Sequence, residues 1–158
     1  MSRPPRVAGF DYIGAYRYLL TFCTRLRQTA FLDEATVADT HAQFLRTATA
    51  EDFAILAYCF MPDHVHLLVE ATADRANFKR FVKLSKQRSG AAYALRVGRP
   101  LWQEGYYDRV LRKDEDVKRV ARYMLENPVR AGLVATPTEY PHLGSDVWSI
   151  VELLTAYQ

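Results

Sequence analysis

The sequence lacks the features that mark secreted, disulfide-bonded or membrane proteins. It contains only two cysteines, Cys23 and Cys59, each among apolar residues. Two isolated cysteines form neither a disulfide framework nor a CxxC metal site, which favours small buried side chains. No apolar run approaches the roughly 20 residues that cross a bilayer. The first residues, MSRPPRVAGFDYIG, lack the apolar centre of a signal peptide. We therefore expect a cytoplasmic protein with no membrane partner.

Acidic residues are missing from one long stretch of a nearly neutral chain. The formal net charge is +3 over 158 residues, yet no aspartate or glutamate lies between Arg75 and Gln103. A basic run of this kind is typical either of a solvated helix face or of a surface that binds phosphate groups. The candidate contacts to a nucleic-acid backbone are Lys79, Lys83, Lys86 and Arg88.

The spacing of apolar residues predicts one domain of mixed helices and strands. Stretches rich in aromatic and β-branched residues predict strands at 15–24, 53–60, 64–71 and 106–112. Helical periodicity predicts helices, the first capped by Asp33, at 32–50, 74–96 and 114–127. The order β-α-β-β-α-β plus an extra helix predicts an α+β, ferredoxin-like (split βαβ) fold, an antiparallel sheet with helices on one face. We expect the domain at 15–136, between an irregular segment 1–14 and a tail 137–158.

Two histidines stand one residue apart in the third expected strand, MPDHVHLLVE (residues 61–70). Side chains alternate along a strand, so His64 and His66 share one face while the valines and Leu67 between and after them face the core. Two imidazoles placed in this way can bind one metal ion, such as Mn, Zn or Fe. The plainer interpretation is a pair of polar residues on a solvated face. Two ligands are also too few, so a metal site needs a third from another element.

The last expected helix places a phenol and an amide side by side, away from its apolar stripe. Projected at about 100° per residue, Tyr123 lies roughly 130° from that stripe, and Asn127 lies next to it. A surface tyrosine is the plainer interpretation. The amide oxygen is nevertheless a candidate third ligand to a metal at His64 and His66, and the phenol a candidate nucleophile toward a phosphodiester. A covalent phosphotyrosine favours strand transfer over hydrolysis because it keeps the energy of the broken bond.

Three ordered motifs resemble one family. MPDHVHLLVE resembles the His-hydrophobic-His strand of the single-strand DNA transposases of the IS200/IS605 type, the Y1 group of HUH enzymes. LWQEGYYDRVLR followed by VARYMLENPVRAGLV resembles the later part of that domain, especially in the REP-associated tyrosine transposases. The segment YRYLLTFCTRLRQTAF resembles the first strand of the family.

The resemblance implies an enzyme that cuts single-stranded DNA near imperfect hairpins and leaves a 5′-phosphotyrosine and a free 3′ hydroxyl. It implies Mg or Mn as the ion, His64, His66 and Asn127 as its ligands, and Tyr123 as the nucleophile. Many members have a glutamine as third ligand, and the shorter asparagine resembles the REP-associated branch. The family contains dimers and monomers, so a homodimer is one of two expectations.

Three alternatives stay open from the sequence. A ferredoxin-like module that binds nucleic acid without chemistry explains the basic run and the aromatics, but needs neither the histidine pair nor the Tyr123–Asn127 pair. A metal-dependent hydrolase using water lacks a clear carboxylate ligand. Tyr106 and Tyr107 are rival nucleophiles, less favoured because neither has an amide at helical spacing.

Overall fold

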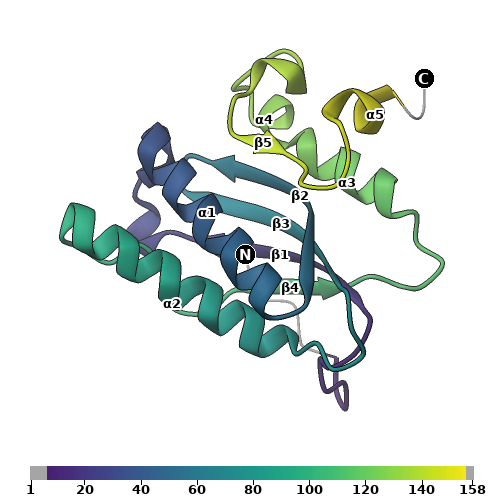
Figure 1. Cartoon of the computed structure of the whole chain (residues 1–158). Coiled ribbons are helices and arrows are strands. Elements are labelled where there is room, and N and C mark those ends of the chain that lie inside the picture. The colour runs from purple at the N-terminus through teal and green to yellow at the C-terminus, as the bar shows by residue number, and fades with distance from the viewer. Residues whose placement is uncertain (1–6, 156–158) are drawn as a thin grey trace.

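The computed structural model describes residues 7–155, which form a five-stranded sheet with helices on both of its faces (Figure 1). Every pairing is antiparallel, and the strand order is β4-β1-β3-β2-β5. The strands are β1 (Arg17–Cys23), β2 (Phe53–Met61), β3 (His64–Ala71), β4 (Tyr107–Val110) and β5 (Leu143–Gly144). The expected hairpin of the second and third strands is β2–β3. The expected α+β, split βαβ arrangement is confirmed, with β5 added at one edge.

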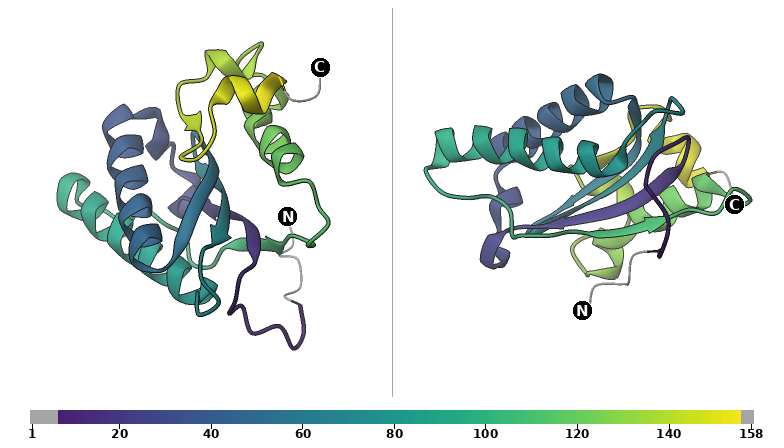
Figure 2. Two further views of the ribbon diagram at one scale, coloured as in Figure 1. Left: turned by 45° about the vertical axis from the view of Figure 1, so that its right-hand side comes forward. Right: turned by 90° about the horizontal axis from the view of Figure 1, so that it is seen from below.

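Two long helices cover one face of this sheet (Figure 2). Helix α1 (Glu34–Ala50) begins where the Asp33 side chain accepts a hydrogen bond from the Thr36 N–H, as the sequence predicts. Helix α2 (Phe78–Val97) is shorter than expected because the Asn77 side chain caps it. It ends at Gly98, which has a φ of 81°.

Three shorter helices lie on the opposite face (Figure 2): α3 (Val117–Leu125), α4 (Asn127–Arg130) and α5 (Ile150–Thr155). The expected helix 114–127 is therefore too long at both ends. Asp116 is its N-cap and accepts from the backbone N–H groups of Lys118 and Arg119, so residues 114 and 115 precede it. Pro128 occupies the first turn of α4, where a missing N–H costs nothing, and α4 starts a new direction.

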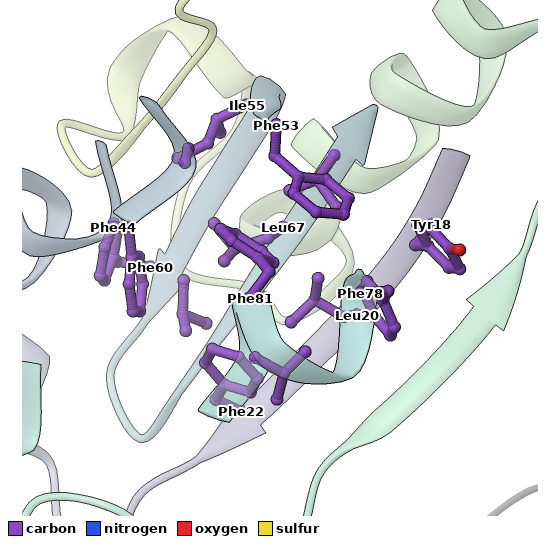
Figure 3. Close-up of a cluster of buried hydrophobic side chains, with 14 of the residues drawn as sticks. Tyr18, Leu20, Phe22, Phe44, Phe53, Ile55, Phe60, Leu67, Phe78 and Phe81 are labelled. Atoms are coloured by element: carbon purple, nitrogen blue, oxygen red, sulfur yellow. The ribbon is translucent and has the colours of Figure 1, made fainter. Parts of the chain in front are cut away.

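The sheet separates two hydrophobic clusters. The larger one lies between the sheet and helices α1 and α2. It contains many aromatic side chains from these elements, several of which are labelled in Figure 3. Val65, Leu67 and Val69 of β3 point into it, as expected. Leu68 points the other way, into the cluster beneath α3. His64 and His66 share the face of Leu68, so they lie on the side that carries α3.

The remaining segments are turns and short helices. The 3₁₀ helices are η1 (Arg25–Arg27), η2 (Ala30–Leu32) and η3 (Pro137–Glu139). Residues 7–14 contain turns and a bridge from Ile13 to Asn77, and residues 1–6 and 156–158 lie outside the described part. Within 7–155 no helix has the length and apolar character needed to cross a membrane. The domain limits at 15 and 136 stay predictions.

Candidate active site

The two histidine side chains of β3 converge. The Nε2 atoms of His64 and His66 lie 3.1 Å apart, and the rings are perpendicular. Each Nδ1 atom has a different partner: Nδ1 of His64 lies 2.7 Å from Oδ1 of Asp63, and Nδ1 of His66 lies 2.9 Å from Oγ1 of Thr21. With both Nδ1 atoms occupied by these neighbours, both Nε2 atoms are directed to one point.

The partners of the histidines are themselves held in place. Thr21 lies opposite His66 in the β1–β3 register, so their side chains share a sheet face. Asp63 accepts a hydrogen bond from Nε of Arg27 at 3.0 Å. Burial by itself raises the pKa of Asp63, but the hydrogen bond from His64 and the charge of Arg27 lower it overall. Asp63 is therefore a carboxylate at neutral pH, and His64 donates its Nδ1–H to it.

Half-buried His66 is a neutral imidazole. Its pKa is lowered to about 3, first by burial, then by the nearby His64, and then by the positive charge of Arg130. A neutral ring with Nδ1 hydrogen-bonded keeps a lone pair on Nε2, which is the form that binds metal ions.

The donor set fits a divalent ion. Two adjacent ligands at about 2.1 Å from an octahedral ion lie about 3 Å apart, close to the 3.1 Å between the two Nε2 atoms. Among residues 7–155, no group of three or more His, Cys, Asp and Glu side chains is placed to hold a metal. Amide, water or substrate oxygens would complete the coordination of an ion held by the two histidines, and such oxygens suit Mg and Mn.

Tyr123 projects from the exposed side of α3. Ala121, Met124 and Leu125 are buried against the sheet, whereas Tyr123 is 64% exposed. The guanidinium of Arg130 lies over the ring of Tyr123, 3.9 Å from the ring centroid, in a cation–π contact. Tyr123 lines a cavity of about 270 Å³ together with Arg119, Arg122 and Glu126.

Asn127 lies at the junction of α3 and α4. Its Nδ2 donates to the carbonyl of Met124 at 2.9 Å, which turns Oδ1 the other way. There Oδ1 accepts a hydrogen bond of 2.9 Å from Nη2 of Arg130. An amide oxygen that faces a cation in this way has the right polarity to bind a metal ion.

Arg130 connects the two halves of the predicted site. It contacts Tyr123 and Asn127, and its charge acts on His66. Within the described residues, no hydrogen bond joins Tyr123 or Asn127 directly to either histidine. The structure thus brings the two histidines together, and it brings Tyr123 and Asn127 together through their shared contact with Arg130.

The rival tyrosines have different surroundings. Tyr106 packs against the larger core, with its ring centroid 6.3 Å from that of Phe22. Tyr107 pairs with Thr21 in the β1–β4 register, so it lies on the histidine face, two strands from His66. Tyr107 is therefore the rival that an experiment has to test.

The four basic residues chosen on α2 do not form one surface. Lys79, Lys83 and Lys86 follow one side of the helix, and Arg88 is about half a turn away from Lys79 and donates to Thr47 on α1. Lys86 is half buried and donates to the carbonyls of Gln103 and Gly105. The role of these residues in DNA binding stays a prediction.

Sequence reasoning assigned no role in the site to Thr21, Arg27 and Arg130, and it treated Asp63 only as a carboxylate near the histidines. Asp63 directly precedes His64, and Arg130 lies three residues after Asn127, so local spacing could have revealed both. Thr21 and Arg27 become neighbours of the site through the register in which β1 pairs with β3, which the sequence pattern does not specify.

Comparisons with known proteins show which family the chain belongs to. The family model described as "Transposase IS200 like" matches residues 13–127. A Haemophilus influenzae protein named as a REP-associated tyrosine transposase is 22% identical over 144 residues, covering 84% of this chain and 81% of the relative.

Two solved structures share the fold. A REP-associated tyrosine transposase bound to a REP hairpin superposes with a TM-score of 0.74 at 21% identity, over 90% of this chain and 82% of that one. A Deinococcus radiodurans protein described as a transposase gives a TM-score of 0.53 at 26% identity, over 77% and 96% of the two chains. Because the family model spans most of the sequence, the chain belongs to the IS200-like transposases, the Y1 tyrosine enzymes of the HUH type.

Proposed function

We propose that this chain is a metal-dependent nuclease and strand transferase for single-stranded DNA that acts through a 5′-phosphotyrosine on Tyr123. The main support for this proposal is that the Nε2 atoms of His64 and His66 lie 3.1 Å apart, while the Nδ1 atoms of both rings are hydrogen-bonded to Asp63 and Thr21. His64 and His66 would hold Mg or Mn, and Asn127 would add its amide oxygen. The membership of the family supports the reaction class.

The proposed reaction is an exchange of phosphodiester partners. The phenol oxygen of Tyr123 attacks phosphorus, and the bond from phosphorus to the 3′ oxygen breaks. The leaving oxygen becomes a 3′ hydroxyl, and it takes up one proton for the one that the phenol loses. When bound, the metal ion supplies neutralising charge at the phosphoryl oxygens. Reversal by another 3′ hydroxyl joins new strands, because the phosphotyrosine keeps the energy of the broken bond.

Arg130 positions the nucleophile in this proposal. Its guanidinium lies against the Tyr123 ring and also donates to the backbone carbonyl of Tyr123 at 2.8 Å. The ring is thereby held to α4 instead of rotating freely in solvent. The positive charge also adds to the attraction of the site for a phosphate.

The proposed substrate is a DNA strand that folds into an imperfect hairpin. The related structure with the highest fold similarity of the two described above holds a REP hairpin. We extend that substrate class to this chain. A homodimer, in which Tyr123 of one copy serves the histidines of the other, stays a prediction.

The test uses single-stranded DNA from hairpin repeats that flank the gene, labelled at the 5′ or the 3′ end. Wild-type protein and the Tyr123→Phe and Tyr107→Phe variants are incubated with Mn, Mg or EDTA and analysed on denaturing gels. We expect a protein–DNA link that needs metal, persists in Tyr107→Phe, and falls on the order of 10³-fold or more in Tyr123→Phe.

Each other result has a definite meaning. Binding without any cleavage contradicts the enzymatic proposal and favours a binding module. A link that is lost in Tyr107→Phe and kept in Tyr123→Phe transfers the nucleophile to β4. Cleavage without a link, unaffected by either change, indicates attack by water.

A further inference from the structure

The turn after β1 presents an apolar side chain to solvent in a strained conformation. Leu26 is 91% exposed. Both Leu26 and Arg27 have a φ of 54°, in the left-handed region that side chains other than glycine rarely adopt. Such conformations persist only where the surrounding structure enforces them, and they concentrate at functional sites.

Hydrogen bonds fix this turn from both sides. The Arg25 N–H donates to the carbonyl of Leu101 at 2.8 Å, and the side chain of Gln28 donates to the carbonyl of Pro100 at 2.8 Å. The hydroxyl of Thr24 closes the turn by donating to the carbonyl of Gln28 at 2.7 Å. Leu26 is therefore held at a defined place and is not a side chain on a loose loop.

Leu26 lines a cavity of about 580 Å³, within the size range of ligand sites, together with Arg25, Gln28, Thr29, Arg99 and Pro100. A second cavity of about 540 Å³ shares Arg99 and Pro100 with the first and adds Lys86 and Trp102. The two linings contain three cationic residues and no acidic one. Arg25 and Arg99 have no carboxylate partner among the described residues. A third cavity beside them includes Asp33, which is already bonded to Thr36 and Arg96.

The turn is connected to the histidine pair. Arg27, the residue after Leu26, donates to Asp63, and Asp63 in turn accepts from His64. The last residue of β1, Cys23, pairs with His64 in the sheet. A DNA strand whose phosphate reaches the histidines therefore passes this end of the sheet.

We propose that the turn Arg25–Arg27 and its cavity bind an unpaired nucleotide that flanks the hairpin, with its base against Leu26 and its phosphates on Arg25 and Arg99. The inference rests on the proposed function. The mixture of an exposed apolar residue with two arginines that have no carboxylate partner matches a single strand, which offers both a free base and a phosphate. A duplex offers only its phosphates and groove edges to such a concave surface.

The test measures binding in EDTA, where no cleavage is expected, by fluorescence polarisation. One probe is the labelled hairpin from the repeats beside the gene with unpaired flanks, and the other is the same hairpin with blunt ends. Leu26→Ala is compared with Leu95→Ala, because Leu95 is 90% exposed on α2. Arg25→Gln and Arg99→Gln are compared with Arg75→Gln, which removes the same charge at the other end of the sheet.

We expect wild type to prefer the flanked probe and Leu26→Ala to weaken that binding about five-fold to ten-fold. Each of the two arginine variants should reduce the slope of log affinity against log salt by about 1. The controls should bind as wild type does, and binding of the blunt probe should change little.

Equal losses on flanked and blunt probes would overturn the inference in favour of contact with the stem. Wild-type affinity in Leu26→Ala and Arg99→Gln, with cleavage of DNA by the wild-type chain intact, would overturn the inference and leave the proposed function standing. A wild-type chain that neither binds nor cleaves hairpin DNA would overturn both.

Discussion

His64 and His66 are directed by two different kinds of neighbour. The Nδ1 atom of His64 is hydrogen-bonded to the carboxylate of Asp63, which Arg27 holds in place. The Nδ1 atom of His66 is hydrogen-bonded to the neutral hydroxyl of Thr21 on the adjacent strand. A carboxylate makes the imidazole a stronger ligand than a hydroxyl does, because it stabilises the positive charge that develops on the ring. His64 is thus the stronger donor of the pair.

Removing the carboxylate behind His64 should weaken metal binding. We expect Asp63→Ala to reduce affinity for Mn about 10-fold to 100-fold, and Asp63→Asn to lose less, because the amide oxygen can still accept from Nδ1. Titration calorimetry with Mn measures this. Asp146→Ala is the matched control, since Asp146 also contacts a histidine, His41, at 3.2 Å. Equal affinities for Asp63→Ala and the control would show that Asp63 does not orient the ligand.

At the scale of single elements, α3 is short and depends on its ends. It has nine residues, fewer than an isolated helix needs for stability in water. Its apolar stripe packs on the sheet, and Asp116 satisfies two backbone N–H groups at its start. Because the helix carries Tyr123, fraying of its first turns would loosen the proposed nucleophile.

The N-cap can be tested by substitution. We expect Asp116→Ala to lower the free energy of unfolding by about 1 kcal/mol, measured by urea denaturation. Asp114→Ala is the control: Asp114 is exposed, and its ion pair with Arg112 is 3.7 Å long, so its loss should change stability by less than about 0.5 kcal/mol. Identical midpoints for the two variants would contradict the assignment of Asp116 as the cap.

The order of elements follows from sequence periodicity, but their ends do not. The second and third strands, and the Asp33 cap of α1, are predicted well because alternation and capping are local signals. The first residue of α3 cannot be predicted from the sequence, because three consecutive acidic residues, 114–116, precede it. In the structure only Asp116 is the N-cap. The same limit applies to the site. The histidine spacing is visible in the sequence, whereas Thr21 reaches His66 only through strand register.

At the scale of the whole molecule, the sheet carries a layer on each face. The face with α1 and α2 holds the larger aromatic cluster, and the face with α3 holds the histidines. Strand β5 and helix α5 come from the tail after residue 136. β5 pairs with the edge of β2, and Leu153 of α5 is fully buried beside α3. The tail therefore supports the helix that carries Tyr123.

Loss of this support should affect both stability and chemistry. Leu153→Ala removes a buried side chain of the smaller cluster, and we expect it to lower the free energy of unfolding by about 2–5 kcal/mol. Val151→Ala, on the exposed side of the same helix, should change it by less than about 0.5 kcal/mol. Urea denaturation measures this change in stability.

The effect on chemistry is measured as the rate of Tyr123–DNA link formation, at a temperature where both variants remain folded. A slower link in Leu153→Ala, with unchanged affinity for hairpin DNA, is expected if α5 holds α3 in its reactive position. Equal stability and equal rates in the two variants would show that the tail packs on the domain without supporting its site.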